Sequence, residues 1–486
     1  MNKRVASFLI NEKDSIKKAM KYIDKSGWEI GLIVNKNKKL IGVATDGDIR
    51  RALLSGKNLK TPIKSIMKTD PIVASKKISP VELLEMMIEK GIHQIPIIDK
   101  NNTIVDIVLL SDLKNIPLSS PDITHKEVKI INQVLSTPFL SIGPHVKTFE
   151  EKVANYIGTK HAISVNSGTS GLHLCIRSLN IKDNDEVITT PFSFIASANC
   201  ILFERAKPVF VDIDENTLCI DPAKIEEKIT KKTKAILPVH IFGHPCQMDK
   251  IMKIAKKHHL LVIEDACEAI GTEFDKKKVG SLGTVSVFAF YPNKQITTAE
   301  GGMILTNDKK IANLCQSMRN QGRDEKGNWL SFKRLGYNYR MNELSAALGV
   351  AQIDRIEEIL IKRQRVADLY NKRLKIINGI RIPFSDSRVK MSWFVYVIRL
   401  DSYRFSRKDR DKIIQRLKKK GINCKDYFSP IHLQPFYRKM FGYKRGDFPI
   451  TEKVSDYTIA LPFYNNLTEK EINYICSHLE RVINEF

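Results

Sequence analysis

The chain has 486 residues, of which 43% are hydrophobic and 27% are charged. This length predicts two to four domains with substantial buried cores. No apolar run approaches the roughly 18 residues of a membrane span, and the N-terminus becomes charged before a signal peptide could form, so a cytoplasmic globular protein is expected.

Neither the charge nor the cysteines predict a nucleic-acid or metal site. The formal net charge is +25, but the basic residues lie in short runs beside helix ends and turns, without interleaved aromatic side chains. We interpret them as a lysine-rich solvated surface whose positive field attracts anionic small molecules. The eight cysteines are scattered singly, which indicates reduced core residues and no metal.

Residues 1–113 contain an internal repeat at an offset of 64 residues. EIGLIVNKNKKLIGVATDGDI (29–49) aligns without a gap with HQIPIIDKNNTIVDIVLLSDL (93–113), and each copy has two apolar runs separated by a polar turn. A helical pattern precedes each copy, at 15–23 and at 79–88. We therefore predict helix, strand, strand and helix, twice.

This repeat resembles the paired cystathionine-β-synthase-type (CBS) domains, α/β modules that often bind adenine nucleotides. In that family a Thr, followed three residues later by an Asp, lies where a helix N-terminus can meet a phosphate. The first copy has Thr45 and Asp48; in the second, Asp112 remains but Leu109 replaces the threonine. The resemblance implies an adenine-nucleotide partner at Thr45 and Asp48, whereas the residues alone equally predict a helix cap.

A Pro- and Ser-rich stretch, KNIPLSSPDITHKE (114–127), separates the repeat from a longer domain. Beyond it, short apolar runs alternate with helix-length segments, which predicts an α/β fold with a mostly parallel sheet covered by helices. The expected strands are at 162–165, 186–190, 208–213, 235–241, 260–266 and 285–290. Functional groups are expected where such strands end.

Two of these strand ends carry groups that can bind a ligand. VNSGTSGLHL (165–174) starts a helix with glycines and hydroxyls, where free N–H groups suit a phosphate, although a capped turn would look the same. The strand at 260–266 contains Glu264 and Asp265, carboxylates that need a cation or a donor when buried, or that cap the next helix.

Lys294 lies 29 residues after Asp265, just beyond the strand VSVFAF (285–290). A lysine there can form an imine with an aldehyde cofactor. Pyridoxal phosphate needs such a lysine, a carboxylate at its pyridine nitrogen and a cradle for its phosphate. The sequence offers all three, in the order cradle, carboxylate, lysine.

From SGTS through EDACEA and FAFYPNKQITTAEGG to RLGYNYRMNELSAALG, the chain resembles the DegT-type sugar aminotransferases of pyridoxal phosphate fold type I. The resemblance runs from about residue 123 to the C-terminus. Together with the CBS resemblance it implies four parts: tandem CBS domains at 1–116 (about 1–60 and 61–116), a linker at 117–122, a cofactor-binding large domain at 123–380 and a small α+β subdomain at 381–486.

The resemblance also implies roles for individual residues. Lys294 is the catalytic lysine that binds the cofactor and moves the proton, and Asp265 partners the pyridine nitrogen. The remaining cofactor-binding positions are Gly168 and Thr169 at the phosphate, Phe194 on the ring, Glu268 near the ring, and Asn338, which in the family reaches the phosphate of the neighbouring subunit. A homodimer with shared active sites is therefore implied. His432 matches a substrate-side position, or is a satisfied core histidine.

Three features depart from the family pattern. Ala289 stands where relatives often have a Ser that binds the cofactor phosphate, so one hydrogen bond is missing. Ala299 replaces the glycine of the usual TTGEGG, which predicts a strained or shifted backbone. The N-terminal repeat is absent from most relatives.

The resemblance implies an aminotransferase that converts the ketone of a nucleotide-linked keto-deoxysugar into an amine, with glutamate as donor, in amino-sugar and surface-glycan biosynthesis. The match of DACEAIG and FAFYPNKQITT points to a 4-keto hexose. Two alternatives stay open: an aminotransferase of a cyclitol or other non-nucleotide keto-sugar, and a nucleotide-sensing binding protein whose transferase domain is a scaffold. Lys294 argues against the related dehydratases, which carry a histidine at that position.

Overall fold

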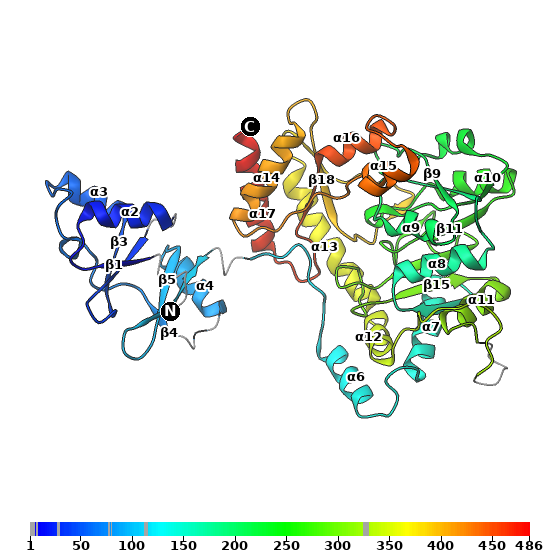
Figure 1. Ribbon diagram of the computed structural model, residues 1–486, viewed down its shortest axis with the longest axis horizontal. Coiled ribbons are helices and arrows are strands. Elements are labelled where there is room, and N and C mark those ends of the chain that lie inside the picture. The colour runs from blue at the N-terminus through cyan, green and yellow to red at the C-terminus, as the bar shows by residue number, and fades with distance from the viewer. Residues whose placement is uncertain are drawn as a thin grey trace. The chain divides into compact units, whose positions relative to one another are not determined.

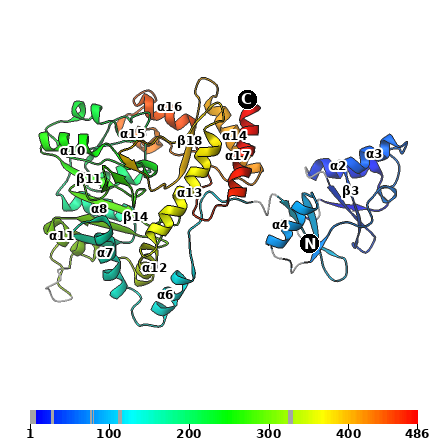
Figure 2. The same ribbon diagram turned by 180° about the vertical axis from the view of Figure 1, so that it is seen from behind.

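The computed structural model of this chain describes residue 5 and residues 8–26, 30–75, 78, 80–110, 115–323 and 330–486. The chain divides into two compact units, one of residues 1–115 with 419–421, and one of residues 116–418 with 422–486. Figures 1 and 2 show their elements from opposite sides. No helix in the described ranges is long and apolar enough to cross a bilayer.

The first unit contains two copies of one α/β motif, with sheets in the order β1-β2-β3 and β4-β5-β6. The elements are β1 Leu9–Asn11, α2 Ile16–Ser26, β2 Ile30–Val34, β3 Leu40–Thr45, α3 Asp46–Leu54, η1 Ile63–Ser65, β4 Ala74–Ser75, α4 Pro80–Glu89, β5 Gln94–Ile98 and β6 Ile104–Leu109. Ile30 pairs with Thr45 in one copy and Gln94 with Leu109 in the other, so the predicted 64-residue repeat is confirmed. Asp112 and the helix expected after it lie outside the described residues.

The two copies share a hydrophobic core. Leu32 and Val34 of β2 belong to the same buried cluster as Ile104 and Ile107 of β6. The turns before β3 and β6 also meet, because Leu40 N–H donates a hydrogen bond to Asn102 O (3.0 Å). Neither copy therefore buries its apolar strand faces alone.

The second unit is built on a seven-stranded sheet in the order β7-β15-β14-β11-β10-β8-β9. Strand β15 is antiparallel to both neighbours, and the other neighbouring strands of this sheet pair in parallel. The bounds are β7 His161–Val165, β8 Glu186–Thr189, β9 Lys207–Phe210, β10 Thr233–Ile236, β11 Leu261–Asp265, β14 Val285–Ala289 and β15 Gly302–Thr306. The predicted mostly parallel α/β sheet is confirmed.

All six predicted strands of this sheet are present, with shifted ends. Strand β10 stops at Ile236 rather than at 241, since Pro238 has no N–H group to continue the ladder. Strand β15 was not predicted. Its side chains are all buried, and a fully buried run of five residues has no alternating pattern.

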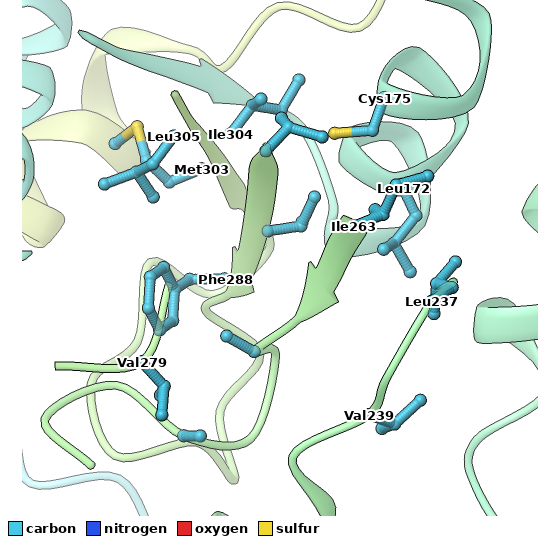
Figure 3. Close-up of a cluster of buried hydrophobic side chains, with 14 of the residues drawn as sticks. Leu172, Cys175, Leu237, Val239, Ile263, Val279, Phe288, Met303, Ile304 and Leu305 are labelled. Atoms are coloured by element: carbon cyan, nitrogen blue, oxygen red, sulfur yellow. The ribbon is translucent and has the colours of Figure 1, made fainter. Parts of the chain in front are cut away.

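The helices of this unit cover the sheet and build a second core. They are α6 His125–Leu135, α7 Pro144–Ile157, α8 Gly168–Ser178, α9 Ala196–Phe203, α10 Met248–Lys257, α11 Lys309–Arg319, α12 Glu343–Ile353, α13 Ile356–Leu374, α14 Arg407–Lys419, α15 Pro435–Phe441, α16 Pro449–Tyr457 and α17 Glu469–Asn484. Short turns of 3-10 helix are η2 Pro222–Lys224, η3 Glu226–Lys228, η4 Ile241–Gly243 and η5 Ile431–Leu433. Figure 3 shows part of the sheet core, where Leu172 of α8 lies near Ile263 of β11.

The C-terminal region has its own small sheet, β16-β18-β19, next to the pair β12-β13 joined to β17. These strands are β12 Glu273–Phe274, β13 Lys277–Lys278, β16 Ile380–Arg381, β17 Val389–Lys390, β18 Tyr396–Leu400 and β19 Thr458–Leu461. Buried side chains of β18, α13, α14 and α17 form a cluster around Tyr370 and Tyr396, whose rings stack at 4.8 Å. The cluster joins elements of the expected small subdomain (381–486) to α13, which lies within the expected large domain (123–380).

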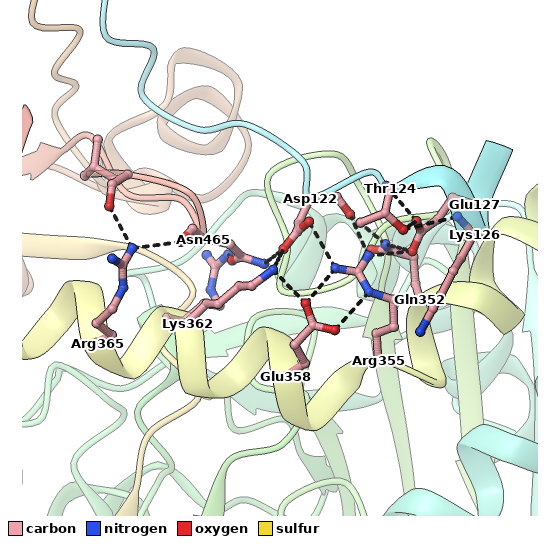
Figure 4. A network of polar contacts seen from close by, with 12 residues as sticks. Asp122, Thr124, Lys126, Glu127, Gln352, Arg355, Glu358, Lys362, Arg365 and Asn465 are labelled. Carbon is pink, nitrogen blue, oxygen red and sulfur yellow. Dashed lines mark hydrogen bonds and ion pairs between the residues drawn. The ribbon is translucent and has the colours of Figure 1, made fainter. Parts of the chain in front are cut away.

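Residues 117–122, which the sequence suggests as a linker, pack against the second unit. Leu118 O accepts a hydrogen bond from Phe463 N–H (2.8 Å). Asp122 is 6% exposed and contacts Arg355, Lys362 and Asn465. Figure 4 shows this network, which joins the start of α6 to α13 and to the C-terminal region.

The sheet topology determines where the site lies. Strands β7, β8, β10, β11 and β14 are parallel, so their carboxyl ends lie at one edge. Antiparallel β15 places its first residue at the same edge, where Gly302 pairs with both Val165 and Ala289. The segments that carry the predicted cradle, carboxylate and lysine all begin at this edge, as expected for a parallel sheet.

Candidate active site

Helix α8 begins directly after β7 at this edge. Its N-cap, Ser167, accepts a hydrogen bond from Ser170 N–H (3.1 Å). The N–H groups of Gly168 and Thr169 belong to the first turn and have no acceptor inside the helix. Together with the helix dipole, they favour an anion at this point. The geometry therefore suits the predicted phosphate cradle.

The cradle is packed tightly against the neighbouring strand ends. A Cβ atom at Gly168 would lie 2.7 Å from Ala289 Cβ and 3.0 Å from Cys267 Sγ. A Cβ atom at Gly302 would lie 2.6 Å from Ser167 O. Only glycine fits these approaches, and Ala289 lies beside the cradle, where a serine hydroxyl would also lie.

The adjacent carboxylates Glu264 and Asp265 point to opposite faces of β11, because side chains alternate along a strand. Glu264 is fully buried and accepts a hydrogen bond from His240 Nε2 (3.0 Å). It also accepts hydrogen bonds from the N–H groups of Gly280, Leu282 and Gly283. Burial alone would raise the pKa of Glu264, but these bonds outweigh it and lower the pKa. Glu264 therefore holds a loop and is not part of the candidate site.

Asp265 is 4% exposed and faces the other side. Its Oδ2 atom accepts a hydrogen bond from Ser197 Oγ (2.6 Å), and Oδ1 accepts one from Cys267 N–H (3.2 Å). Among the residues that the structure describes, this buried carboxylate has one neutral hydroxyl donor and one backbone donor but no cationic partner. Asp265 is thus suited to a protonated ring nitrogen.

Lys294 lies in the turn after β14, with its side chain 12% exposed. Its Nζ atom is 3.5 Å from Glu268 Oε1. Glu268 Oε2 accepts a hydrogen bond from the N–H group of Phe242 (2.8 Å), a residue with φ of 56°. Burial raises the pKa of Glu268, against the opposing effects of Lys294 and of this N–H group. The lysine amine is therefore placed beside a buried carboxyl group.

Phe394 approaches the same amine, with its ring centre 3.9 Å from Lys294 Nζ. The backbone that carries it is fixed by Arg363, which is 3% exposed and donates to Trp393 O (2.6 Å) and Phe394 O (2.7 Å). Trp393 has a left-handed φ of 54°, which requires such external support. Burial lowers the pKa of Arg363 to about 9.

The loop that follows Lys294 is tied to distant segments. Gln295 Nε2 donates to Glu268 O (2.7 Å). Thr297 N–H donates to Gln352 Oε1 (3.2 Å), and the Nε2 atom of the same glutamine donates to Asp122 O (2.9 Å). Ala299 has φ of 65°, so the strained backbone predicted for this position is confirmed.

Two predicted residues of the site are exposed. Phe194, in the segment between β8 and α9, is 60% exposed. Asn338 is also exposed, and its backbone forms a bridge with Asn320. Exposed groups at these positions are available to a ring or to a second chain.

His432 lies in the core, fully buried in the turn η5. Its Nε2 atom is 3.0 Å from Glu452 Oε1, and its ring lies against Phe448 at 4.7 Å. Burial lowers the pKa of His432, although Glu452 opposes that effect. This environment is that of a core histidine, although no described residue forms a hydrogen bond with its Nδ1 atom.

In the first unit, Thr45 and Asp48 form a capping box at the start of α3. Thr45 Oγ1 donates to Asp48 Oδ2 (2.7 Å), and Asp48 Oδ1 is 2.6 Å from Arg51 Nη2 and 3.7 Å from Lys68 Nζ. Burial raises the pKa of Asp48, but the bonds from Thr45 and Arg51 outweigh it and lower the pKa. Leu109, at the corresponding position of the second copy, is buried.

Three residues that contact the predicted site residues were not predicted from the sequence. Phe394, Phe242 and Ser197 contact Lys294, Glu268 and Asp265 respectively. One signal could have identified Ser197, since it lies in the hydroxyl-bearing stretch PFSFIASAN after a strand. Phe242 and Phe394 resemble ordinary core positions, so only the fold identifies them.

The residues present fit pyridoxal phosphate. An anion cradle that excludes a Cβ atom, a buried carboxylate that accepts from a hydroxyl and a backbone N–H group, and a partly buried amine meet at one strand edge. In the described part of the chain no three metal-ligating side chains come together, and all eight cysteines are free. The fold and the arrangement of these residues suit a pyridoxal-phosphate-dependent enzyme.

Comparison with known proteins gives the family. The chain belongs to the DegT/DnrJ/EryC1/StrS aminotransferase family, whose sequence pattern matches residues 121–480, and the CBS domain pattern matches residues 1–55 and 63–118. These are sugar aminotransferases that use pyridoxal phosphate.

Three relatives illustrate the similarity. An uncharacterised protein of Methanocaldococcus jannaschii is 42% identical over 76% of this chain and 98% of its own length. The GDP-perosamine synthase of Caulobacter vibrioides is 38% identical over 77% of this chain and 100% of its own. The solved PLP form of a putative sugar aminotransferase from Streptococcus pneumoniae is 27% identical, with a TM-score of 0.73 over 76% of this chain and 99% of that one.

Proposed function

We propose that the protein transfers an amino group from glutamate to the keto carbon, C4, of a nucleotide-linked keto-deoxyhexose. The observation that carries this proposal is the Lys294 amine, held between Glu268 and Phe394 at the edge that also carries Asp265 and the cradle. The 38% identity to a GDP-perosamine synthase supports a nucleotide-linked sugar as substrate.

Each residue has a separate task in this proposal. Bound pyridoxal phosphate supplies an electron sink for the charge that develops when a proton leaves the substrate carbon. Asp265 holds the proton on the pyridine nitrogen, and Gly168 and Thr169 N–H groups bind the phosphate. Lys294 Nζ attaches the cofactor and, when free, carries the proton. Glu268 fixes the position of that amine.

The test uses purified protein, pyridoxal phosphate and a panel of GDP-, UDP- and dTDP-linked 4-keto and 3-keto hexoses, with a keto-cyclitol and free keto-sugars added. We expect glutamate to change the cofactor absorbance to that of the amine form, and a nucleotide-linked 4-keto sugar to restore it. Lys294→Ala should abolish both changes, whereas exposed Lys309→Ala should abolish neither.

Other outcomes would favour the alternatives. If only the cyclitol or the free keto-sugars are converted, the substrate is not a nucleotide-linked sugar. An intact cofactor spectrum without any turnover would favour a binding protein, and a spectrum unaffected by Lys294→Ala would remove the catalytic role of that lysine.

We further propose a homodimer in which Asn338 contributes to the cofactor phosphate site of the partner. Asn338 is exposed, and large apolar side chains on α6 and the loop after it are exposed as well, including Val128, Leu135, Phe139 and Ile142. Such apolar surface is typical of a subunit interface. Sedimentation equilibrium tests the dimer, and a monomer at micromolar concentration would refute it.

We also propose that the CBS unit binds an adenine nucleotide at Thr45 and Asp48 and thereby biases activity. Support comes from the CBS match and from the start of α3, where Arg51 and Lys68 bring positive charge beside the helix N-terminus. Calorimetric titration of the full chain with AMP, ADP and ATP tests it. Thr45→Val should weaken binding and Thr103→Val should not; no binding heat with any nucleotide would refute the proposal.

A further inference from the structure

Residues 337–339 form an extended segment in which alternate side chains point in opposite directions. The rings of Tyr337 and Tyr339 stack on one side, with centroids 4.9 Å apart and planes 10° from parallel. Asn338 therefore points to the other side, and it is exposed. The two tyrosines act as the anchor, and the asparagine is the residue that the segment presents.

The backbone of this segment is fixed within its own subunit. Tyr337 N–H donates to Met318 O (2.6 Å), and Tyr339 N–H donates to Arg319 O (2.9 Å). Asn166 N–H donates to Tyr339 O (2.9 Å). These hydrogen bonds fix the position of the backbone of residues 337–339. The direction of the side chains depends in addition on the contacts of the two tyrosine rings.

His173 of α8 contacts the rings of both Tyr337 and Tyr339. Its Nδ1 atom is 3.1 Å from Tyr339 Oη, and its ring lies edge-on to Tyr337 at 4.9 Å. Its Nε2 atom is 2.8 Å from Glu204 Oε1, and the other oxygen of Glu204 accepts from Arg177 Nη1 (2.6 Å). The imidazole is 4% exposed, so these contacts replace water.

The chemistry of the ring assigns the direction of each hydrogen bond. The Glu204 carboxylate can only accept, so His173 Nε2–H donates to it. Burial lowers the pKa of His173 in spite of Glu204, so the ring is neutral at pH 7 and Nδ1 accepts from the Tyr339 hydroxyl. A chain of directed bonds thus runs from Arg177 and Glu204 through His173 to Tyr339.

We propose that His173 is a positioning residue for the active site of the partner subunit, because it fixes the direction in which Asn338 leaves its own subunit. This inference rests on the proposed function, in which Asn338 serves the cofactor phosphate of the partner. The competing explanation is local: His173 lies on α8, whose first turn is the cradle of its own subunit. The two explanations place the effect of a His173 substitution in different active sites.

The test uses two mixed dimers, assembled from differently tagged full-length subunits, that contain the same substitutions in different arrangements. In the first, one subunit carries His173→Leu and the other Lys294→Ala. In the second, one subunit carries both substitutions and the other none. Each mixed dimer has Lys294 in only one of its two subunits. The readout is the dissociation constant of pyridoxal phosphate, measured from the absorbance of the cofactor bound to that Lys294.

The reference is a mixed dimer of one wild-type subunit and one Lys294→Ala subunit. We expect the first dimer to bind pyridoxal phosphate as tightly as this reference. The second dimer should bind it about ten-fold more weakly, which corresponds to one lost hydrogen bond. The opposite order would overturn the inference in favour of the local explanation, and equal affinities would overturn it as well. Tyr339→Phe, which keeps the ring and removes only the hydroxyl, should give the same order with a smaller effect, about three-fold.

Asn338→Ala, placed in the same two arrangements, tests separately whether the active site is shared between subunits. If Asn338→Ala weakens binding only in the second arrangement while His173→Leu does not, the shared site stands and the inference fails. If Asn338→Ala weakens binding only in the first arrangement, the shared site itself fails.

Discussion

The Nζ atom of Lys294 lies 3.9 Å from the centre of the Phe394 ring, although the two residues are far apart in the sequence. The face of an aromatic ring is negative, so this contact stabilises and orients the charged amine. The small C-terminal region thereby contributes directly to the position of the lysine.

Replacing Phe394 with Leu should lower kcat about 2- to 30-fold, the range expected for loss of one cation–π contact of about 0.5–2 kcal/mol. Phe394→Tyr retains the ring and should stay within about two-fold of wild type. Single-turnover kinetics with glutamate measure the step. Equal effects of Leu and Tyr would show that the ring face is unimportant.

Asp265 and Glu264, the neighbouring carboxylates of β11, should respond differently when each is replaced by its amide. Asp265→Asn should fold normally and lose activity by about 100-fold or more, because an amide cannot hold the proton on the pyridine nitrogen. Glu264→Gln should instead lower the unfolding temperature, since the carboxylate accepts four hydrogen bonds inside the core. Thermal unfolding and steady-state kinetics of both variants provide the comparison. A normally active Asp265→Asn enzyme would remove the proposed role of that residue.

Ala289 lies beside the cradle, so a hydroxyl at this position should reach a bound phosphate. Ala289→Ser is expected to tighten pyridoxal phosphate binding about 3- to 10-fold, through one added charge-assisted hydrogen bond. Ala289→Val adds volume without a donor and should weaken binding, because the alanine methyl already meets the Gly168 position closely. Equilibrium titration of the apoprotein measures both constants. Weaker binding by the serine variant would mean that the cradle has no room for the hydroxyl.

Ala299 holds a left-handed conformation that is strained for alanine. Ala299→Gly should therefore be neutral or stabilising by up to about 1 kcal/mol, after the greater backbone freedom of glycine in the unfolded chain is subtracted. Ala351→Gly, in the regular helix α12, should destabilise by about 1 kcal/mol. Denaturant unfolding of the two variants gives the contrast, and similar losses in both would contradict it.

The network of Figure 4 predicts a loss of stability in acid. Burial alone would raise the pKa of Glu127, but hydrogen bonds from Thr124, Arg355 and Gln352 outweigh it and lower the pKa to about 2. Because the folded-state pKa is below the ordinary value of 4.5, this contribution is complete above pH 4.5 and is lost as the pH falls towards 2.

Glu127→Gln should therefore cost about 2–3 kcal/mol at pH 7, and the difference from wild type should shrink below pH 4.5. The control is Glu151→Gln, which removes an exposed pair at 3.8 Å and should change stability by less than about 1 kcal/mol at any pH. Unfolding curves of the second unit at pH 7, 5, 4 and 3.5 measure both. A difference that stays constant with pH would refute the assignment.

Local patterns in the sequence predicted much of this molecule. The repeat is visible because Ile30 to Thr45 and Gln94 to Leu109 follow the same strand, turn and strand pattern. The order of the cradle, Asp265 and Lys294 is visible because each follows a buried strand, and parallel strands end at one edge. The roles of these residues remain predictions, although the structure brings them to the same edge.

Other features depend on contacts that no local pattern records. Strand β15 is buried on both faces, so it lacks the alternation that marks a strand. Asp122 lies in a stretch with the composition of a linker, and it is buried only because Arg355 and Asn465 meet it from distant parts of the chain. Phe242 and Phe394 acquire their significance from Glu268 and Lys294, which folding brings to them.

Gln352 links two segments of the second unit that are far apart in the sequence. Its amide nitrogen binds the carbonyl oxygen of Asp122, close to the end of the N-terminal unit in the sequence, and its oxygen binds Thr297, three residues after Lys294. A side chain that is 1% exposed has no water with which to exchange either bond. A displacement of residue 122 would therefore strain buried bonds to Arg355, Asn465 and Gln352, and the last of these also holds the loop that follows Lys294.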